Sequence, residues 1–319
     1  MPVNSFSHYP HGFSHGVAIR GVPIVSTRVG NVFYVNSNTG NNSGAADGSI
    51  TKPFASLEYA KSRCTANNGD TVFAMPGHAE TIANATTLVG DKADIAFVGL
   101  GTGSRRPTLT FTTATTANIP VSAANVTFHN FLFVANFADV ASFITIAAAP
   151  EFCVEHCEFR DTSSVLNALT CVTTTVTVNA DGFTFTHNRI LSLGTTAATT
   201  AIVVAGTMSR LSINDNWYVG AALSNTAALL EHGALNVTAL EMARNKVYRP
   251  TTDTATGAIL IKTTATANTG MAYDNYVGCL DAAGIILFTS GSDYAPINNL
   301  VTGAVNASGF LLPAADTDA

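Results

Sequence analysis

The 319-residue sequence is poor in charged residues, and this scarcity excludes several kinds of protein. Asp, Glu, Lys and Arg together make up 11% of the chain, well below the quarter that is usual for soluble domains. The 15 basic residues are scattered without a run or patch, which argues against a nucleic-acid partner. No apolar run approaches the roughly 20 residues of a membrane span, and no secretory signal is visible at the N-terminus.

Cysteine is also scarce, and its pattern predicts neither disulfides nor a metal site. The five cysteines are Cys64, Cys153, Cys157, Cys171 and Cys279. Their number is odd, their spacing is irregular and no CxxC pair occurs, so we expect reduced, buried thiols in a protein made in a cytosol. The acidic residues lack the regular spacing of a calcium loop, so we expect no metal and no cofactor.

An eight-residue pattern recurs along the second half of the chain. It reads apolar, any, apolar, two polar, Asn, any, apolar, most clearly in residues 183–190, 211–218 and 240–247 and more weakly in 270–277 and 294–301. The asparagines of the five copies are Asn188, Asn216, Asn245, Asn275 and Asn299. Their separations are 28, 29, 30 and 24 residues, and Cys157 and Phe131 take the same place in earlier copies. Self-similarity at such a period predicts stacked repeats.

Each repeat also contains a second short apolar run, such as residues 143–146, 201–204 and 258–261. We therefore expect at least two short strands per repeat, joined by turns into a coil of roughly 20–30 residues. About eight such coils would stack in parallel into a rod of roughly 40 Å. The abundance of Ala, Thr and Val suits the narrow interior of such a rod, which favours small and β-branched side chains.

A second pattern precedes the repeats. Residues 32–36 (VFYVN), 48–49 (GS), 52–57 (KPFASL) and 69–77 (GDTVFAMPG), together with Ala60, resemble the opening of the pectate-lyase-like right-handed parallel β-helix superfamily, in its tailed-phage virion protein type. The resemblance implies an all-β fold, a single-stranded right-handed parallel β-helix with an N-terminal capping helix. The sequence places that helix between residues 53 and 67. The resemblance says little about function, because lyases, hydrolases, epimerases, adhesins and phage virion proteins share this fold.

The sequence divides into three parts. Residues 1–30 form an extended N-terminal arm, residues 31–94 the N-terminal cap of the β-helix, and residues 95–319 its coils. Gly21 and Pro23 argue against a helix in the arm, and its apolar side chains are too few to form a core of their own. We therefore expect the arm to contact a partner or another subunit. The arm residues that we assign to this contact are Phe6, Phe13, Val17, Ile19, Arg20 and Ile24.

The repeated asparagines suggest either a structural ladder or a ligand contact. An inward Asn at a corner can bond both the turn backbone and the equivalent Asn one coil away, so we favour the ladder. The residues one position earlier should point outward and form a polar stripe, with ion pairs between coils. This stripe includes His156, His187, Asp215, Arg244 and Asp274. A solvated stripe is favoured, and glycan binding by it is left open.

Catalytic residues do not stand out in the sequence. The densest group of acids is Glu155, Glu158 and Asp161, of which Glu155 and Asp161 could approach each other, but they fit no catalytic motif. Trp217 is the single tryptophan, so exposed aromatic rings for sugar stacking are expected to be few. We therefore predict that the chain is not an enzyme.

The favoured function is that of a structural protein of a tailed-phage virion, most concretely a capsid decoration, or cement, protein of the head. It would be made in the host cytoplasm, form a homotrimer, and attach through its arm to the major capsid protein or another virion protein. The alternative is a phage tailspike or adhesin that binds or degrades host polysaccharide. A secreted polysaccharide lyase is disfavoured, because a signal and clustered calcium ligands are not apparent.

Overall fold

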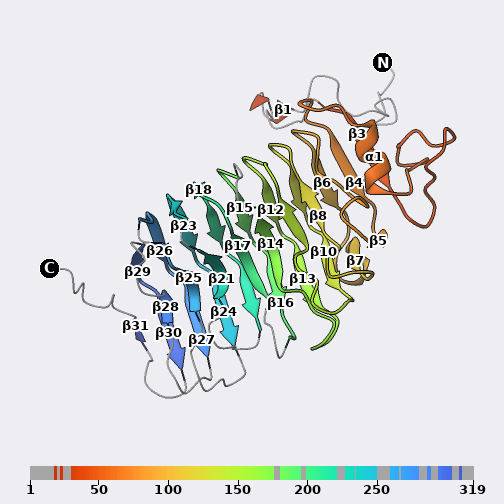
Figure 1. The fold of residues 1–319 in the computed structure, drawn as a ribbon. Coiled ribbons are helices and arrows are strands. Elements are labelled where there is room, and N and C mark those ends of the chain that lie inside the picture. Colours follow the sequence, from red (N-terminus) through yellow and green to blue (C-terminus); the bar gives the residue numbers. More distant parts are fainter. Residues whose placement is uncertain are drawn as a thin grey trace.

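The structure is a computed structural model in which the chain winds into a β-solenoid (Figure 1). It describes residues 18–19, 22–23, 30–175, 180–194, 199–220, 227–233, 235–249, 259–265, 267–279, 286–288, 294–303 and 309–310. Within these residues there is one α-helix, α1 (Leu57–Arg63), and it is far too short to cross a membrane. The predicted right-handed parallel β-helix is confirmed.

Three stacked sheets form the walls of the solenoid. The first sheet contains β3 (Val32–Val35), β4 (Thr71–Ala74), β6 (Ala96–Gly99), β9 (Thr127–His129), β12 (Cys153–Glu155), β15 (Thr184–Thr186), β19 (Ser212–Asn214), β23 (Leu240–Ala243), β26 (Gly270–Tyr273) and β29 (Ala295–Ile297). The second contains β5 (Ala79–Ile82), β7 (Thr108–Phe111), β10 (Leu132–Ala135), β13 (Glu158–Asp161), β16 (Arg189–Leu191), β20 (Trp217–Val219), β24 (Lys246–Arg249), β27 (Tyr276–Cys279), β30 (Leu300–Gly303) and β31 (Gly309–Phe310). The third contains β8 (Ile119–Val121), β11 (Ile144–Ile146), β14 (Thr170–Thr174), β17 (Thr200–Val204), β21 (Ala227–His232), β25 (Ile259–Thr263) and β28 (Ile286–Phe288).

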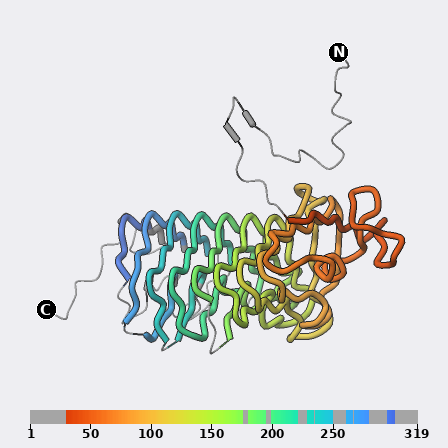
Figure 2. The backbone as a smooth tube through the Cα atoms, turned by 90° about the horizontal axis from the view of Figure 1, so that it is seen from above, coloured from red at the N-terminus to blue at the C-terminus, as the bar shows by residue number. Residues whose placement is uncertain are grey.

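Neighbouring strands within each of these sheets are parallel, except for the terminal pair β30–β31. Figure 2 shows the successive coils stacked one on another, with their corners in line. The seven strands of the third sheet define roughly six turns, fewer than the eight or so coils expected from the sequence. Two small pairs complete the described strands: β1 (Ala18–Ile19) with β2 (Val22–Pro23), and β18 (Met208–Ser209) with β22 (Val237–Thr238).

Each repeated eight-residue pattern spans two strands rather than one. In residues 183–190 the strand β15 ends at Thr186 and β16 begins at Arg189, so the chain changes sheet between them. The second apolar run of each repeat, such as residues 201–204, forms the strand of the third sheet. A coil therefore has three strands, and the repeated asparagines lie at the corner between the first and second sheets.

The interior of the solenoid is filled by side chains that repeat in register from coil to coil. Phenylalanines stack in the earlier coils: the ring centroids of Phe97 and Phe128 are 4.9 Å apart, and those of Phe133 and Phe159 are 4.7 Å apart. All four side chains are buried. Burying one such ring stabilises the fold by about 1.5–3 kcal/mol, so these stacks are a principal source of stability for the rod.

Polar side chains hold the segments of the N-terminal cap together. Helix α1 begins after Ser56, whose side chain accepts a hydrogen bond from the Tyr59 N–H, so it starts later than the residue 53 expected from the sequence. Asp70 accepts hydrogen bonds from the N–H groups of Asn31 and Thr65, both at 2.6 Å. Burial opposes ionisation of Asp70, but these hydrogen bonds outweigh it and lower its pKa.

The predicted arm lies almost entirely outside the described residues. Its backbone is described at β1 and β2, which pair antiparallel through Ile19 and Val22. Among the arm residues assigned to a partner contact, Phe6, Phe13, Val17, Arg20 and Ile24 lie outside the described residues, as does the side chain of Ile19. The partner contact of the arm therefore stays a prediction.

Candidate functional site at the asparagine corner

The corner between the first and second sheets is a two-residue turn that repeats along the rod. The first residue of the turn has a positive φ and faces outward. These residues, here called the corner stripe, are Asn130 (59°), His156 (55°), His187 (55°), Asp215 (59°), Arg244 (55°), Asp274 (54°) and Asn298 (51°). Asn, Asp and His are the residues other than glycine that adopt this left-handed conformation most often, whereas Arg does so at a cost of about 1 kcal/mol or more.

The second residue of the turn points inward and forms a continuous hydrogen-bonded ladder. The N–H groups of Asn188, Asn216, Asn245 and Asn275 each donate to the side-chain oxygen of the next asparagine, over 2.9 to 3.1 Å, and the last acceptor is Asn299. Each of these amides also donates to a backbone carbonyl, as Asn216 Nδ2 does to Phe185 O at 2.9 Å. The five asparagines are at most 2% exposed, and their buried, hydrogen-bonded side chains hold the turns together.

Three histidines gather on the outer surface of the corner. His129 Nδ1 donates to Glu155 Oε1 over 3.1 Å, and both residues belong to the same outward row of the first sheet. The ring of His156 lies 5.1 Å from that of His129 and 4.8 Å from that of His187, between centroids. The rings of His156 and His187 are nearly parallel, at 21°, so coil-on-coil stacking brings together residues that are 26 to 58 positions apart in sequence.

These histidines line a cavity of about 380 Å³, here called the histidine pocket. Its walls are Arg106, His129, Asn130, His156, Cys157, Glu158, His187 and Arg189. Volumes of this order accommodate a small ligand. Cys157, which takes the place of a ladder asparagine on its coil, is one of the walls of the pocket.

The charges in the histidine pocket are unevenly compensated. Glu158 is nearly buried and accepts from Arg106 Nη1 at 3.2 Å and from Arg160 Nε at 3.1 Å. Both guanidinium groups are therefore engaged by one carboxylate. The guanidinium of Arg189 instead lies 4.7 Å from the centroid of the Trp217 ring, and no carboxylate of the described residues lies within 4 Å of it. Arg189 is the cation of this pocket that remains available to an anionic ligand.

The pKa of His156 is lowered from its ordinary value of 6.5. Partial burial is the largest cause, followed by repulsion from His129 and His187, and these outweigh the attraction of Glu155 for the protonated form. The imidazole of His156 is accordingly neutral at pH 7. A neutral imidazole in a pocket beside a free guanidinium can accept a proton from a bound ligand.

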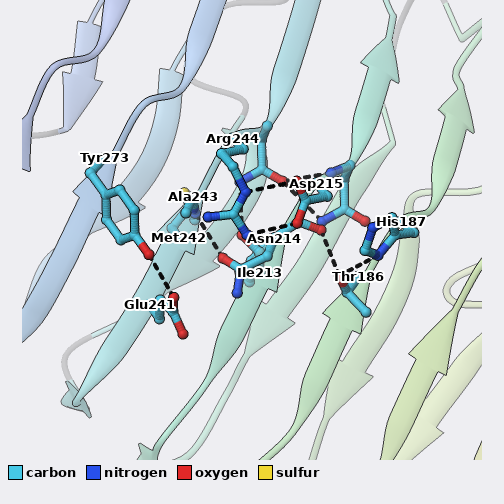
Figure 3. A network of polar contacts seen from close by, with 12 residues as sticks. Thr186, His187, Ile213, Asn214, Asp215, Glu241, Met242, Ala243, Arg244 and Tyr273 are labelled. Atoms are coloured by element: carbon cyan, nitrogen blue, oxygen red, sulfur yellow. Dashed lines mark hydrogen bonds and ion pairs between the residues drawn. The ribbon is translucent and has the colours of Figure 1, made fainter.

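The corner stripe continues past the histidine pocket with an ion pair (Figure 3). Arg244 donates to both carboxylate oxygens of Asp215, at 2.9 and 2.8 Å, and this bond is the main cause of the lowered pKa of Asp215. In the same view Tyr273 donates to Glu241 at 2.7 Å and Thr186 contacts His187 at 2.9 Å. The ion pair joins neighbouring coils, so this part of the stripe is electrically balanced.

A second row of outward-facing side chains runs beside the corner stripe on the second sheet. This row, here called the outer column, consists of Leu132, Glu158, Arg189, Trp217, Lys246, Tyr276 and Leu300, which pair in register from strand to strand. Trp217 is 48% exposed although it is the single tryptophan of the chain. From the sequence, exposed aromatic rings for sugar stacking were expected to be few, but the register of the strands places this ring between two cations.

The acids that seemed densest in the sequence do not form a catalytic pair. Glu155 faces outward beside His129, whereas Asp161 is 2% exposed and accepts from the N–H groups of Ala168 at 2.9 Å and Leu193 at 2.8 Å. Burial raises the pKa of Asp161 despite these bonds. Glu155 ends a strand of the first sheet and Asp161 ends the next strand, on the second sheet, so the corner lies between them.

The cysteines of the described residues are unlinked. Burial raises the pKa of the Cys64, Cys153 and Cys157 thiols to about 12, and it raises that of Cys171 as well. These thiols are therefore protonated and poorly nucleophilic at pH 7. The side chain of Cys279 lies outside the described residues. No group of three or more His, Cys, Asp or Glu in the described part of the chain is arranged to hold a metal ion.

Comparison with known proteins gives similarity of fold. No family model matches the chain, and no curated protein sequence matches it. Among solved structures, it is similar to a rhamnogalacturonan lyase (13% identity over 89% of this chain and 90% of that one, TM-score 0.41). It is also similar to a pectate lyase from Bacillus sp. N165 in complex with trigalacturonate (15% identity over 90% of this chain and 86% of that one, TM-score 0.45). A third similar structure is a lacto-N-biosidase from Eubacterium ramulus (11% identity over 85% of this chain and 68% of that one, TM-score 0.36).

These similarities correct one prediction. The chain was expected not to be an enzyme, and this is contradicted by the structures it resembles, which are lyases and a lacto-N-biosidase. At identities of 11 to 15% the similarity concerns the β-helix fold, so an activity for this chain has to be argued from its own residues. The virion location, the capsid decoration role, the homotrimer and its partners stay predictions from the sequence.

Proposed function

We propose that the chain binds an acidic polysaccharide on the outer surface of the asparagine corner and cleaves it by β-elimination in the histidine pocket. One observation carries this proposal: the pocket combines a guanidinium that is free of carboxylates, that of Arg189, with the neutral imidazole of His156. The first suits the carboxylate of a uronate residue, and the second suits a carbon acid beside that carboxylate.

The binding step uses the charge pattern of the pocket. Arg106 and Arg160 are held by Glu158, so Arg189 contributes the uncompensated positive charge. A planar guanidinium binds a carboxylate through two parallel hydrogen bonds, which fixes both the position and the orientation of the sugar. The contact with the Trp217 ring holds Arg189 in place before the ligand arrives. A neutral sugar would gain none of this, so the proposal is restricted to acidic glycans.

The chemical step moves one proton and needs no water. His156 takes the proton from C5 of the uronate, and the resulting charge spreads onto the carboxylate that Arg189 neutralises. The electron pair forms the C4=C5 double bond as the C4–O glycosidic bond breaks. The protonated His156 then gives its proton to the departing oxygen, which becomes a hydroxyl group. Glu155 stabilises the protonated imidazole through its negative charge.

Hydrolysis suits the same residues poorly. A glycosidase places two carboxyl groups across the scissile bond, one of them able to donate a proton. Glu158 is engaged by two guanidinium groups, Asp161 is buried beneath a turn, and Glu155 is bonded to His129. None of the three is free to act as the proton donor of such a pair.

We further propose, from the sequence, that this activity belongs to a tailspike of a tailed phage. The resemblance of residues 32–77 to phage β-helix proteins supports this location, and residues 1–30 would be the attachment arm. A chain that begins at Asn31 should keep its glycan activity but fail to join particles. Normal incorporation of the shortened chain would contradict the proposed attachment.

The proposed activity can be tested with a variant that preserves the turn. Purified protein is incubated with polygalacturonate, alginate or hyaluronan, and the unsaturated product is followed by its ultraviolet absorbance. His156→Asn keeps a residue that favours positive φ and should lower the rate by about 10²-fold or more, as expected for loss of a general base. Arg210→Asn changes a residue with the same φ of 55°, away from the pocket, and should leave the rate unchanged. Full activity of His156→Asn would refute the assignment.

A further inference from the structure

We infer that a second pocket, next to the histidine pocket along the rod, binds another acidic residue of the same glycan, so that the polysaccharide runs parallel to the solenoid axis. The second pocket has a volume of about 340 Å³ and is lined by Asp215, Asn216, Trp217, Arg244 and Lys246. This inference rests on the proposed function, because it takes the ligand to be an acidic polysaccharide.

The cations of the outer column set the direction of the bound glycan. Arg189 and Lys246 pair with Trp217 on either side of it in the second sheet. They are therefore two strand spacings apart, about 10 Å along the axis. No carboxylate of the described residues lies within 4 Å of the Lys246 amine, just as for Arg189. Two such charges in one line match a ligand whose own negative charges repeat along its length.

The other charges of the second pocket do not interfere with an anion. Arg244 and Asp215 neutralise each other in a two-point ion pair, and that pair keeps the pKa of Asp215 low. The negative charge of Asp215 is therefore offset by Arg244, and Lys246 gives the pocket a net positive charge. A matching anionic group is the ligand that this arrangement selects.

Trp217 provides the surface between the two charges. The guanidinium of Arg189 lies 4.7 Å from its centroid and holds the indole in one orientation, while 48% of the residue remains exposed. A held, half-exposed aromatic ring offers an apolar surface to the C–H groups of a sugar. The sugar residue that links the two acidic subsites would lie over this ring.

The single tryptophan makes the second pocket directly observable, because all tryptophan fluorescence of the chain comes from Trp217. The titration uses His156→Asn, which keeps the ligand intact, with galacturonate and mannuronate hexamers and with neutral cellohexaose. At least one acidic hexamer should change the fluorescence with saturation, and cellohexaose should not. An unchanged signal with both acidic hexamers, while wild-type protein cleaves the corresponding polymer, would overturn the inference.

A matched pair of lysine variants tests the charge. Lys246→Met, in the His156→Asn protein, should weaken hexamer binding about fivefold, the effect of one exposed charge pair. Lys262→Met removes a partly buried lysine that pairs with Glu231 on the third sheet, and it should leave binding unchanged. Equal effects of the two variants would contradict a site at Lys246.

The failure of this inference can be told apart from the failure of the proposed function. In the active protein, Lys246→Met should raise KM about fivefold for the polymer and leave kcat unaltered, because Lys246 does not touch the reacting atoms. Saturable fluorescence changes without cleavage by the wild-type protein would refute β-elimination and still support the second pocket. Cleavage with KM and kcat insensitive to Lys246→Met would refute the second pocket alone.

Discussion

Replacing Asn216 with Leu should destabilise the solenoid by about 3 kcal/mol. Asn216 is 1% exposed and its side chain makes three hydrogen bonds. It accepts from the Asn188 N–H at 2.9 Å, and its amide donates to Phe185 O and to Asn245 Oδ1, each at 2.9 Å. Leucine has a similar shape, so the substitution removes the three bonds without opening a large cavity.

The magnitude follows from the groups that lose a partner. Three buried polar groups on the two coils that flank Asn216 are left with fewer hydrogen bonds, and each loss costs about 1–1.5 kcal/mol when water cannot enter. The added apolar surface of leucine returns about 1 kcal/mol. Because each coil contacts its neighbours alone, the loss should appear as a weakened interface in the middle of the rod.

The assay is urea unfolding followed by circular dichroism, with Asn214→Leu as the matched control. Asn214 lies on the same coil and accepts one hydrogen bond, from the Ala243 N–H at 2.8 Å, but it faces outward and is half-buried. Water can replace that bond, so the control should lose less than about 1 kcal/mol. Equal losses of unfolding free energy in the two variants would contradict a buried asparagine ladder whose polar groups are all hydrogen-bonded.

Three further predictions concern charge and packing. The cleavage rate should fall as acid protonates His156. Because the pKa of His156 is lowered, activity should persist below the pH at which an ordinary histidine titrates. His187→Asn removes a neighbour that repels the protonated imidazole, so the fall in the pH–rate profile should move to higher pH. Arg244→Met should lower the stability only slightly, since the pair is largely exposed. Because the pKa of Asp215 is lowered in the folded protein, the stabilisation by this pair is present above the unfolded-state pKa and is lost as the pH falls through the folded-state pKa. The unfolding curves of the two proteins should therefore converge in acid. Phe133→Ala should cost about 3–5 kcal/mol in urea unfolding because this buried ring stacks in the core, and a loss under 1 kcal/mol would contradict that packing.

The period of the asparagines carries most of what the sequence predicts about the fold. Asn188 and its equivalents mark one corner of the later coils, because each buried turn there needs the same hydrogen-bond partners. The two strands that flank each asparagine are harder to separate. β15 and β16 have three residues each, so together they resemble one interrupted apolar run rather than two walls of a solenoid.

The candidate site is much less visible in the sequence, because it depends on register between coils. Arg106 and Glu158 are 52 residues apart, and the three stacked histidines come from three successive coils. No local motif brings such residues together. The sequence does contain one indication of the site, which is the outward-facing residue before each asparagine. When the repeats are aligned on Asn188, this position places His156 and His187 on neighbouring coils, one above the other. The uncompensated charge of Arg189 follows only from the side-chain contacts of its neighbours.

Elimination in the histidine pocket makes one new reducing end and one new double bond for each glycosidic bond that is cleaved. Both products are counted in the same digest of polygalacturonate, alginate or hyaluronan, the double bonds by their ultraviolet absorbance. We expect one double bond for each new reducing end with at least one of these polymers, and loss of both signals in His156→Asn. Reducing ends without double bonds, or no cleavage of any of the three, would contradict the proposed elimination.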